Sequence, residues 1–528
     1  MELLLRLFKY FNRRQLQAAA QKEKDRTPAR GAVQNTLRAN LEAIRSIFSH
    51  APDLVIRSFA FHQTGSQAVL IYLNGLADKN SINNNVLYQL MFESEDIAGH
   101  GKRPSGTVKM PVLPVTLGHI STFTGFEHIE LSILHGKSVL FIDGIPQAYA
   151  FDTQGWPQRA ISDSQIEASL KGAHQGFIET SEMNVALIRR YISSRELKIK
   201  ELSVGSRVAS KVSIMYLEDV THPELVAEME RRLTSLNVDC ILNTGELAEL
   251  IEDRPFSLLP QYITTERPDT AASQLLQGRL CVVVDRSSSV LIAPAGIAAF
   301  FQGIDDYSTR WPVATFMRLL RFFACMLAAF LPGIYIACIS FNHEVIPLDL
   351  ILSIGQFRAA VPFPPFIEAL IMEITLEMLR EAGVRLPAPV GQTVGIVGGI
   401  VIGQAAVQAG IVSNLMVVVV ASTAVASFIL PNFDMASAVR LIRFPVMILA
   451  SLFGIVGIIA AFMVLIAHLI TLTSLSQPFT VPIAPLRIGD WKDVFVRLPL
   501  WNMLKRPESV KSLQKIRMGM NRTGDEDQ

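Results

Sequence analysis

Three long stretches without a single charged side chain constrain the fold of this chain more than any other feature. They cover residues 322–343, 386–433 and 444–486. A helix needs about 20 apolar residues to cross a bilayer, whereas buried helices of soluble proteins are shorter and amphipathic. The first stretch therefore predicts one span. The second is long enough for two spans with a break near 410–414, and the run 444–472 in the third predicts one tilted span.

Charge is distributed very unevenly along the 528 residues. The chain carries 48 Lys+Arg and 47 Asp+Glu, yet only 12 charged residues fall between positions 322 and 471. A net charge of +1 excludes a strongly basic nucleic-acid-binding protein, so we expect no nucleic-acid partner. The four cysteines are too few for a disulfide scaffold. The sequence indicates a soluble front joined to a membrane-embedded back.

Arginine pairs mark the edges of the apolar stretches and predict which side each edge faces. One pair precedes each stretch, and positive residues favour the cytosolic side of a membrane. These residues are Arg318, Arg321, Arg380, Arg385, Arg440 and Arg443. The tail from residue 487 is also basic, and residues 1–14 are too short and too charged for a secretory signal. We therefore expect both the front and the tail to be cytosolic.

The expected orientation of the tail conflicts with a simple count of spans. If residues 444–472 crossed once from the cytosol, the tail would end on the outer side. Either this run does not cross simply, or another segment is re-entrant. Both alternatives remain open from the sequence.

A proline cluster interrupts the helical pattern between the first two apolar stretches. The sequence VPFPPF at 361–366 contains Pro362, Pro364 and Pro365. Proline lacks a backbone donor and restricts the residue before it, so the helix must break there and resume near residue 367. Broken helices at membrane depth are tolerated where they are buried in protein or line a cavity, and in transporters they mark ion paths.

Carboxylates follow the proline break at helical spacing. Glu373, Glu377 and Glu381 recur every four residues on one face, and Glu368 lies slightly off that line. Carboxylates inside a membrane are costly and usually functional. Two interpretations remain open: the acidic face lines a cation pathway, or the helix lies at the interface with Glu377 paired to Arg380. No histidine lies at ligand spacing, so we expect no metal site.

A glycine-rich stretch follows at residues 391–410. Its small residues recur every four positions, at Gly391, Gly395, Gly399 and Gly403. Neutral polar groups accompany them, at Gln392, Gln404 and Gln408. Small residues at this spacing let helix backbones approach closely, so the pattern predicts tight helix packing. A pore-lining helix with glutamine at a constriction is the alternative.

The front of the chain contains an internal repeat of about 140 residues. LHGKSVLFID at 134–143 corresponds to LQGRLCVVVD at 276–285, and VLIYL at 69–73 corresponds to SIMYL at 213–217. Alternating strands and helices in each copy argue for two tandem α/β subdomains, and Asp143 and Asp285 are expected to bond within their own turns. Neither copy contains a phosphate loop, a nucleophile elbow or an HExxH motif, so we expect no catalytic residues and no cofactor.

These features together predict an α+β chain with a membrane part. Two tandem α/β subdomains form a cytosolic N-terminal domain, followed by an α-helical transmembrane domain of about 4–6 spans that includes the Pro-broken helix. The expected segments are a helical and linker region at 1–58, the subdomains at 59–181 and 182–310, the transmembrane domain at 311–486 and the basic tail at 487–528.

Several longer motifs resemble one known family. They are IKELSVG at 199–205, GELAELIED at 245–253, TERP at 265–268, DDY at 305–307, VPFPPF at 361–366, EMLREAG at 377–383, the run 391–410 and RLP at 497–499. On these residues the chain resembles the A subunits of spore germinant receptors, the GerA family. The resemblance covers about residues 182–500, and its most specific part is the run from 361 to 410.

The resemblance implies a role in germination at the spore inner membrane. Its expected partners are a transporter-like nutrient-binding B subunit, a lipoprotein C subunit and further copies of the same chain. The A subunit would form or gate a path for monovalent cations, and the resemblance assigns it no catalytic residues. The alternatives are a non-conducting sporulation-stage scaffold of the same family and a secondary transporter that acts alone.

Overall fold

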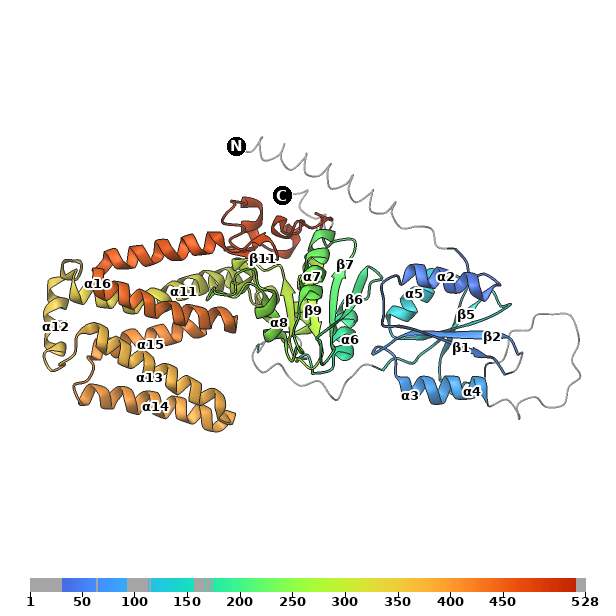
Figure 1. Ribbon diagram of the computed structural model, residues 1–528, viewed down its shortest axis with the longest axis horizontal. Helices are drawn as coiled ribbons and strands as arrows, with labels where there is room; N and C mark the ends of the chain where they lie inside the picture. Colours follow the sequence, from blue (N-terminus) through green and yellow to red (C-terminus); the bar gives the residue numbers. More distant parts are fainter. Residues whose placement is uncertain are drawn as a thin grey trace, which may run out of the picture.

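The computed structural model describes residues 31–62, 65–92, 113, 115–155, 167, 172 and 174–518. Two α/β units and a bundle of helices follow one another along the longest axis of the molecule (Figure 1). The amphipathic pattern of residues 1–14 and the last ten residues of the tail lie outside the described residues. The expected boundary at residue 59 falls inside the first strand, β1 (Leu54–Ala60).

The first unit is a five-stranded sheet between two layers of helices. Its strand order is β1-β2-β4-β5-β3, and each neighbouring pair is antiparallel. The remaining strands are β2 (Gln67–Leu73), β3 (Ile120–Phe123), β4 (Ser138–Ile142) and β5 (Ala148–Phe151). The helices are α2 (Leu37–Ile47) and α5 (Phe126–Leu134) on one face, and α3 (Lys79–Ser81), η1 (Ile82–Leu87) and α4 (Tyr88–Met91) on the other. Because helices cover both faces, β4 and β5 are buried at every residue.

The second unit repeats the first in the same order, β6-β7-β9-β10-β8. Its strands are β6 (Leu197–Val204), β7 (Ser210–Leu217), β8 (Ile263–Thr265), β9 (Leu280–Val284) and β10 (Val290–Ala293). Its helices are α6 (Ser181–Tyr191) and α9 (Pro268–Leu276) on one face, and α7 (Pro223–Ser235) and α8 (Thr244–Ile251) on the other. The predicted repeat falls on β2 and β7 and on β4 and β9, which confirms the duplication.

Matching polar contacts recur in the two copies. Asp143 accepts a hydrogen bond from the backbone N–H of Leu37 at 2.9 Å, and Asp285 accepts one from Ser181 at 3.3 Å. Leu37 and Ser181 are the first residues of α2 and α6, so both aspartates bond to helix N-termini. The predicted bonds within their own turns are therefore replaced by contacts about 100 residues away along the chain. Sequence spacing alone does not reveal such contacts.

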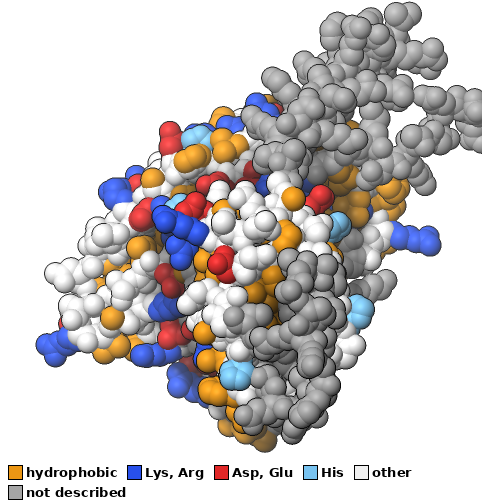
Figure 2. Space-filling model, turned by 90° about the vertical axis from the view of Figure 1, so that its right-hand side faces the viewer, with side chains coloured by type: hydrophobic (Ala, Val, Ile, Leu, Met, Phe, Trp, Pro, Cys, Tyr) orange, Lys and Arg blue, Asp and Glu red, His pale blue; other side chains and the backbone are white. Residues whose placement is uncertain are grey.

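The surface of the first unit carries charges of both signs. Figure 2 views the molecule from the end formed by this unit, and Lys/Arg and Asp/Glu side chains are interspersed over its described part. A large single-sign field is absent from this described face, as the near-zero net charge suggests.

The helical bundle begins after short helices that link it to the second unit. These are η2 (Ile297–Phe301) and α10 (Asp305–Ser308). The bundle consists of α11 (Trp311–Ser340), α12 (Leu348–Arg358), α13 (Pro365–Arg385), α14 (Ala388–Gln408), α15 (Asn414–Phe428) and α16 (Phe433–Thr471). By length and composition, two helices in the described part, α11 and α16, are long and apolar enough to cross a membrane. Large apolar side chains are exposed along the bundle, for example Phe323, Val401 and Val456, which is unusual for a surface in water.

α16 folds back on itself instead of running straight. Gly454 has φ 62° and ψ −139°, a conformation that is open to glycine and costly for residues with a Cβ. Asn342 accepts a hydrogen bond from the N–H of Ile455 at 3.2 Å, at the start of the second half. The halves 433–453 and 455–471 diverge from this turn in Figure 1. The run 444–472, expected as one tilted span, is therefore not one continuous straight helix.

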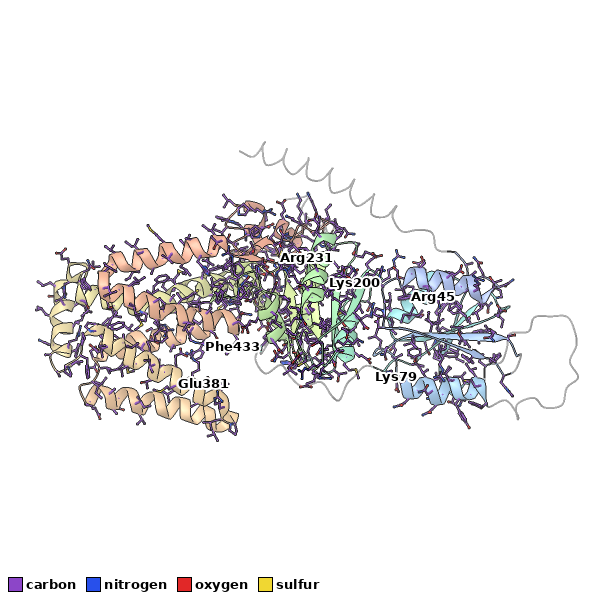
Figure 3. The ribbon with its side chains drawn as sticks, in the orientation of Figure 1. Arg45, Lys79, Lys200, Arg231, Glu381 and Phe433 are labelled. Carbon is purple, nitrogen blue, oxygen red and sulfur yellow. The ribbon has the colours of Figure 1, made fainter. Side chains whose placement is uncertain are left out.

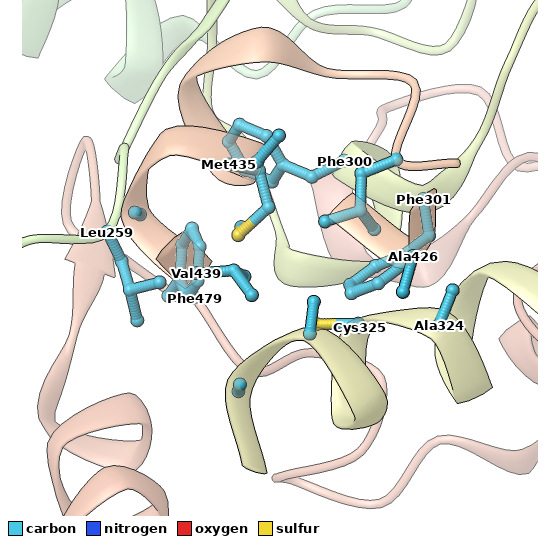
Figure 4. Packing of buried hydrophobic residues seen from close by; sticks show 14 of the residues in the cluster. Leu259, Phe300, Phe301, Ala324, Cys325, Ala426, Met435, Val439 and Phe479 are labelled. Atoms are coloured by element: carbon cyan, nitrogen blue, oxygen red, sulfur yellow. The ribbon is translucent and has the colours of Figure 1, made fainter. Parts of the chain in front are cut away.

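The fold-back brings the tail to the base of α11. Nε2 of His468 lies 2.9 Å from the hydroxyl of Ser257 in the second unit. The rings of Phe479 and Phe300 pack in a tilted arrangement with their centroids 5.8 Å apart. Figure 4 shows Phe479 beside Met435, Val439 and Cys325, so both ends of α16 meet η2 and α11 in one apolar cluster. The tail continues in short turns, η4 (Ile488–Asp493), η5 (Leu500–Asn502) and η6 (Glu508–Val510).

Candidate functional site

The acidic face of α13 turns into the bundle. Pro364 caps α13 and Pro365 is its first residue, where a missing N–H costs nothing. Pro362 lies in the non-helical segment between α12 and α13, so the predicted break is present. From this start the helix carries Glu368 and Glu373 into the interior, where they are 0% and 1% exposed. Such burial is possible only if the carboxylates find partners.

Arg443 of α16 is the partner of Glu373. The two side chains form an ion pair, and Thr423 of α15 donates a second hydrogen bond to Glu373 at 3.3 Å. Arg443 also donates from Nε to the backbone oxygen of Ala328 in α11 at 2.9 Å. That oxygen is free because Pro332, four residues further on, has no N–H to bond it. One charge pair therefore joins four helices.

Glu368 is bound at the N-terminus of α15. It accepts hydrogen bonds from the backbone N–H and the hydroxyl of Ser413, the N-cap of α15, at 3.0 and 2.9 Å. A helix N-terminus favours a negative charge. Arg358, the last residue of α12, approaches Glu368 at 3.2 Å. The proline break thus lets the end of α12 return onto the start of α13.

The outer part of the acidic face is paired but less buried. Glu377 contacts Arg380 at 3.1 Å and Arg440 at 3.5 Å, so the predicted pair at spacing three is present. Glu381 pairs with Arg385 at 2.6 Å on the surface. Figure 3 shows Glu381 and Phe433, the first residue of α16, at the same end of the bundle. In this conformation every carboxylate of the acidic face is bound to an arginine.

The glycine stretch separates into packed and open positions. A Cβ on Gly391 would lie 2.6 Å from the backbone oxygen of Gly383, so the start of α14 packs closely on α13. A Cβ on Gly403 would lie 3.8 Å from Val417, whereas a Cβ on Gly399 would meet no described atom within 4 Å beyond its own helix backbone. The expected continuous packing ladder is therefore found only in part.

The two predicted glutamines whose side chains are described do not lie inside the bundle. Gln404 and Gln408 are exposed on α14. The side chain of Gln392 and the surroundings of Gly395 lie outside the described residues. A constriction formed by Gln404 and Gln408 would therefore require a second chain.

A second buried charge cluster lies at the base of α11. Arg318 is 0% exposed and bonds to Asp306 at 2.9 Å and to Asp493 of the tail at 2.8 Å. Tyr307 donates its hydroxyl to Asp493 at 2.9 Å, and Arg497 lies over the Tyr307 ring. Burial raises the pKa of Tyr307 above its ordinary range, which keeps it a donor. This cluster links the second α/β unit, α11 and the tail.

Sequence reasoning identified the carboxylates and the pair between Glu377 and Arg380, but it missed the partners of the buried Glu368 and Glu373. Arg443 and Arg318, which precede two of the charge-free stretches, are buried at 2% and 0% exposure. One available signal was Pro332, which predicts a free carbonyl at Ala328 inside an apolar helix. Among the described residues no group of His, Cys, Asp and Glu side chains could hold a metal ion.

Similarity to known proteins identifies the class to which this fold and cluster belong. The family described as Bacillus/Clostridium GerA spore germination protein matches residues 42–509. The chain belongs to the GerA family of spore germination proteins, which confirms the family predicted from the motifs.

Individual relatives are similar in sequence to this chain along nearly its whole length. The chain is 37% identical over 500 residues to spore germination protein KA of Bacillus subtilis, covering 94% of this chain and 90% of that protein. It is 38% identical over 475 residues to spore germination protein B1 of Bacillus subtilis, covering 90% and 97%. It is 36% identical over 474 residues to GerLA of Bacillus cereus, covering 89% and 95%.

One solved structure is similar to the front of the chain. It is the crystal structure of the N-terminal domain of the A subunit of the Bacillus megaterium spore germinant receptor GerK3. The sequence identity is 27%, the TM-score is 0.39, and the match covers 50% of this chain and 97% of that domain.

Proposed function

We propose that this chain is a membrane subunit of a nutrient germinant receptor in bacterial spores and that it forms or gates a path for monovalent cations. The observation that carries the proposal is the charge cluster on α13, where Glu368 and Glu373 are buried against Arg358 and Arg443. Ionisable residues inside membrane segments mark ion pathways and relays in other proteins. Membership of the GerA family supports the role in germination.

Six membrane passes belong to this proposal: α11, α13, α14, α15 and the two halves of α16. An even number returns the chain to its starting side, so the N-terminal domain and the tail share the cytosolic side of the spore inner membrane. The fold-back at Gly454 and the contact between Arg318 and Asp493 support this topology. α13 and α14 have 21 residues each, enough for about 30 Å of helix.

The conformation described here corresponds to a closed path in this proposal. Glu373 neutralises Arg443, and neither side chain faces solvent. Opening would require the pair to separate, so that α13 and α16 move apart and the carboxylate meets the passing cation. Nutrient binding then needs to favour the separated state by only a few kcal/mol to shift the population.

The outer face of α14 supports the proposal that the chain oligomerises. Gln404 and Gln408 are exposed there. Polar side chains and small residues promote helix association in lipid. We place this face against a second copy of the chain, and propose a transporter-like B subunit and a lipoprotein C subunit as further partners. Reading frames for such subunits next to this gene would support the receptor assignment.

The pathway is tested by removing both charges of the buried pair together. Glu373→Gln combined with Arg443→Gln leaves no unpaired charge in the bundle. We expect spores with the double variant to release monovalent cations several-fold more slowly after nutrient addition. The matched control is Glu381→Gln with Arg385→Gln, which neutralises an exposed pair on the same helix and should leave release unchanged.

Three outcomes separate the candidate functions. Normal release by the double variant, at normal subunit levels in the membrane, removes Glu373 from the pathway. Purified chain that conducts no ions in bilayers favours a sporulation-stage scaffold. Flux of a defined solute into vesicles that hold only this chain favours a secondary transporter.

A further inference from the structure

A buried cation that forms no ion pair with any described residue lies under the tail, away from the bundle. Arg279 follows Gly278 in the turn between α9 and β9 and is 7% exposed. Its Nε and Nη1 atoms are buried and have no hydrogen-bond partner among the described residues. A buried guanidinium has five N–H donors to satisfy and cannot lose its charge cheaply. Something that the chain itself does not supply is expected to compensate it.

The internal repeat shows that this burial is specific to the second copy. The corresponding turn of the first copy is Gly136-Lys137, and Lys137 is only partly buried. In the second copy the tail covers the turn: the N–H of Leu513 donates to Val220 at 2.8 Å, and a Cβ on Gly278 would lie 3.2 Å from Ser512. The tail therefore encloses a positive charge that the first copy leaves accessible to water.

Arg279 lines a cavity of about 50 Å³. Polar groups from three parts of the chain line this cavity. Gln277 belongs to the second unit and Gln302 to the segment that links this unit to the bundle. Gln477 lies in the hairpin after α16, and Ser509 lies in the tail. Pockets for nutrient-sized molecules hold roughly 300–1,000 Å³. One water needs roughly 10–15 Å³ of such space, so this cavity suits a few waters or one small ion.

The two carboxylates near the cavity are already bound elsewhere. Asp490 accepts hydrogen bonds from the backbone N–H groups of Glu508 and Ser509, each at 3.0 Å. Asp493 accepts from Arg318 and Tyr307. Burial lowers the pKa of Arg279 to about 10, so it stays charged at neutral pH. Arg279 therefore forms no ion pair with a carboxylate of the described structure.

We propose that this cavity binds one small monovalent anion, of the size of chloride, on the guanidinium of Arg279. The volume excludes larger ligands, and the flanking Asp490 and Asp493 disfavour a dianion such as sulfate or phosphate. The bound anion holds the tail against the second α/β unit at the base of α11. It thereby stabilises the joint through which the N-terminal domain connects to the bundle.

The test measures the thermal stability of the purified full-length chain in detergent. Chloride replaces gluconate at constant ionic strength, and we expect the Tm to rise by about 2 °C, because a ligand that binds the folded state alone stabilises it. Arg279→Met should abolish this rise and should be at least as stable as the wild type in gluconate, since it removes an uncompensated charge. Lys137→Met, at the matching position of the first copy, should keep the chloride response.

A second measurement does not depend on the variant folding. Hydrogen exchange of the wild type should slow in chloride at the tail amides around Leu513, and not in the first unit. The proposal is overturned by an equal chloride response in wild type and Arg279→Met, or by unchanged exchange at these amides. A response to sulfate but not to chloride overturns the assignment of a monovalent anion.

Discussion

At the scale of single residues, the bundle depends on charges that satisfy one another in an apolar environment. Arg443 reaches Glu373 and also the carbonyl of Ala328 that Pro332 leaves free. A buried pair of this kind adds little net stability, but the loss of one partner leaves a buried charge uncompensated. We therefore expect the pair to act mainly by selecting one arrangement of α11, α13, α15 and α16.

Single and double neutralisation of this pair should differ sharply. Glu373→Gln alone leaves Arg443 buried without a counter-charge and should lower the free energy of unfolding by about 3–5 kcal/mol. Glu373→Gln with Arg443→Met should recover most of that loss, because no charge remains buried. Glu381→Gln, in an exposed pair, should cost about 1 kcal/mol or less. Denaturation in detergent micelles measures all three, and a double variant no more stable than the single one would contradict the argument.

At the scale of elements, the breaks in the helices determine the arrangement of the bundle as much as the helices themselves. The proline break positions Arg358 on Glu368, and the turn at Gly454 divides α16 into two halves. Both breaks depend on backbone chemistry that few residue types provide. The second break decides where the tail lies.

Substitution of Gly454 should be more costly than substitution of a helical glycine. Gly454→Ala places a Cβ at positive φ and within 2.9 Å of Phe341, so we expect a loss of about 1–3 kcal/mol. Gly399→Ala adds its Cβ to open space in helical backbone and should be neutral or stabilise by about 1 kcal/mol. Thermal unfolding of the two variants compares them directly. Equal stability would contradict the assigned turn.

At the scale of the whole molecule, three parts of the chain meet at the base of α11. The second α/β unit, the return of α16 and the tail share the apolar cluster around Phe300 and Phe479 and the charges around Arg318. A change in the N-terminal domain can therefore reach the bundle through packed side chains and not only through the connecting chain.

Cysteine labelling tests the proposed six-pass topology. In vesicles of known orientation, Glu381→Cys and Leu513→Cys should react from the same side, and Glu344→Cys from the opposite side. Glu344 follows α11 and Glu381 lies near the end of α13, at opposite ends of the bundle. A single span for α16 would instead place Leu513 on the side of Glu344. The native Cys240 and Cys338 are half-buried and are replaced by serine to remove background.

The sequence alone determined features that depend on local composition and spacing. The charge-free runs, the proline break, the pair between Glu377 and Arg380 and the duplicated units can all be predicted, because periodicity and backbone restrictions act within a few residues. The motifs between 361 and 410 were specific enough to predict the GerA family.

Only the tertiary structure decided which distant groups meet. Glu373 and Arg443 are 70 residues apart, and Arg318 and Asp493 are 175 apart. Arg279 is enclosed only because the tail folds over it. Such contacts arise from how helices and sheets pack and not from their spacing along the chain. The physical reason is that a buried charge needs a partner, and the partner is set by which side chains the packing brings close to it. The spacing of residues in one sequence does not specify that packing.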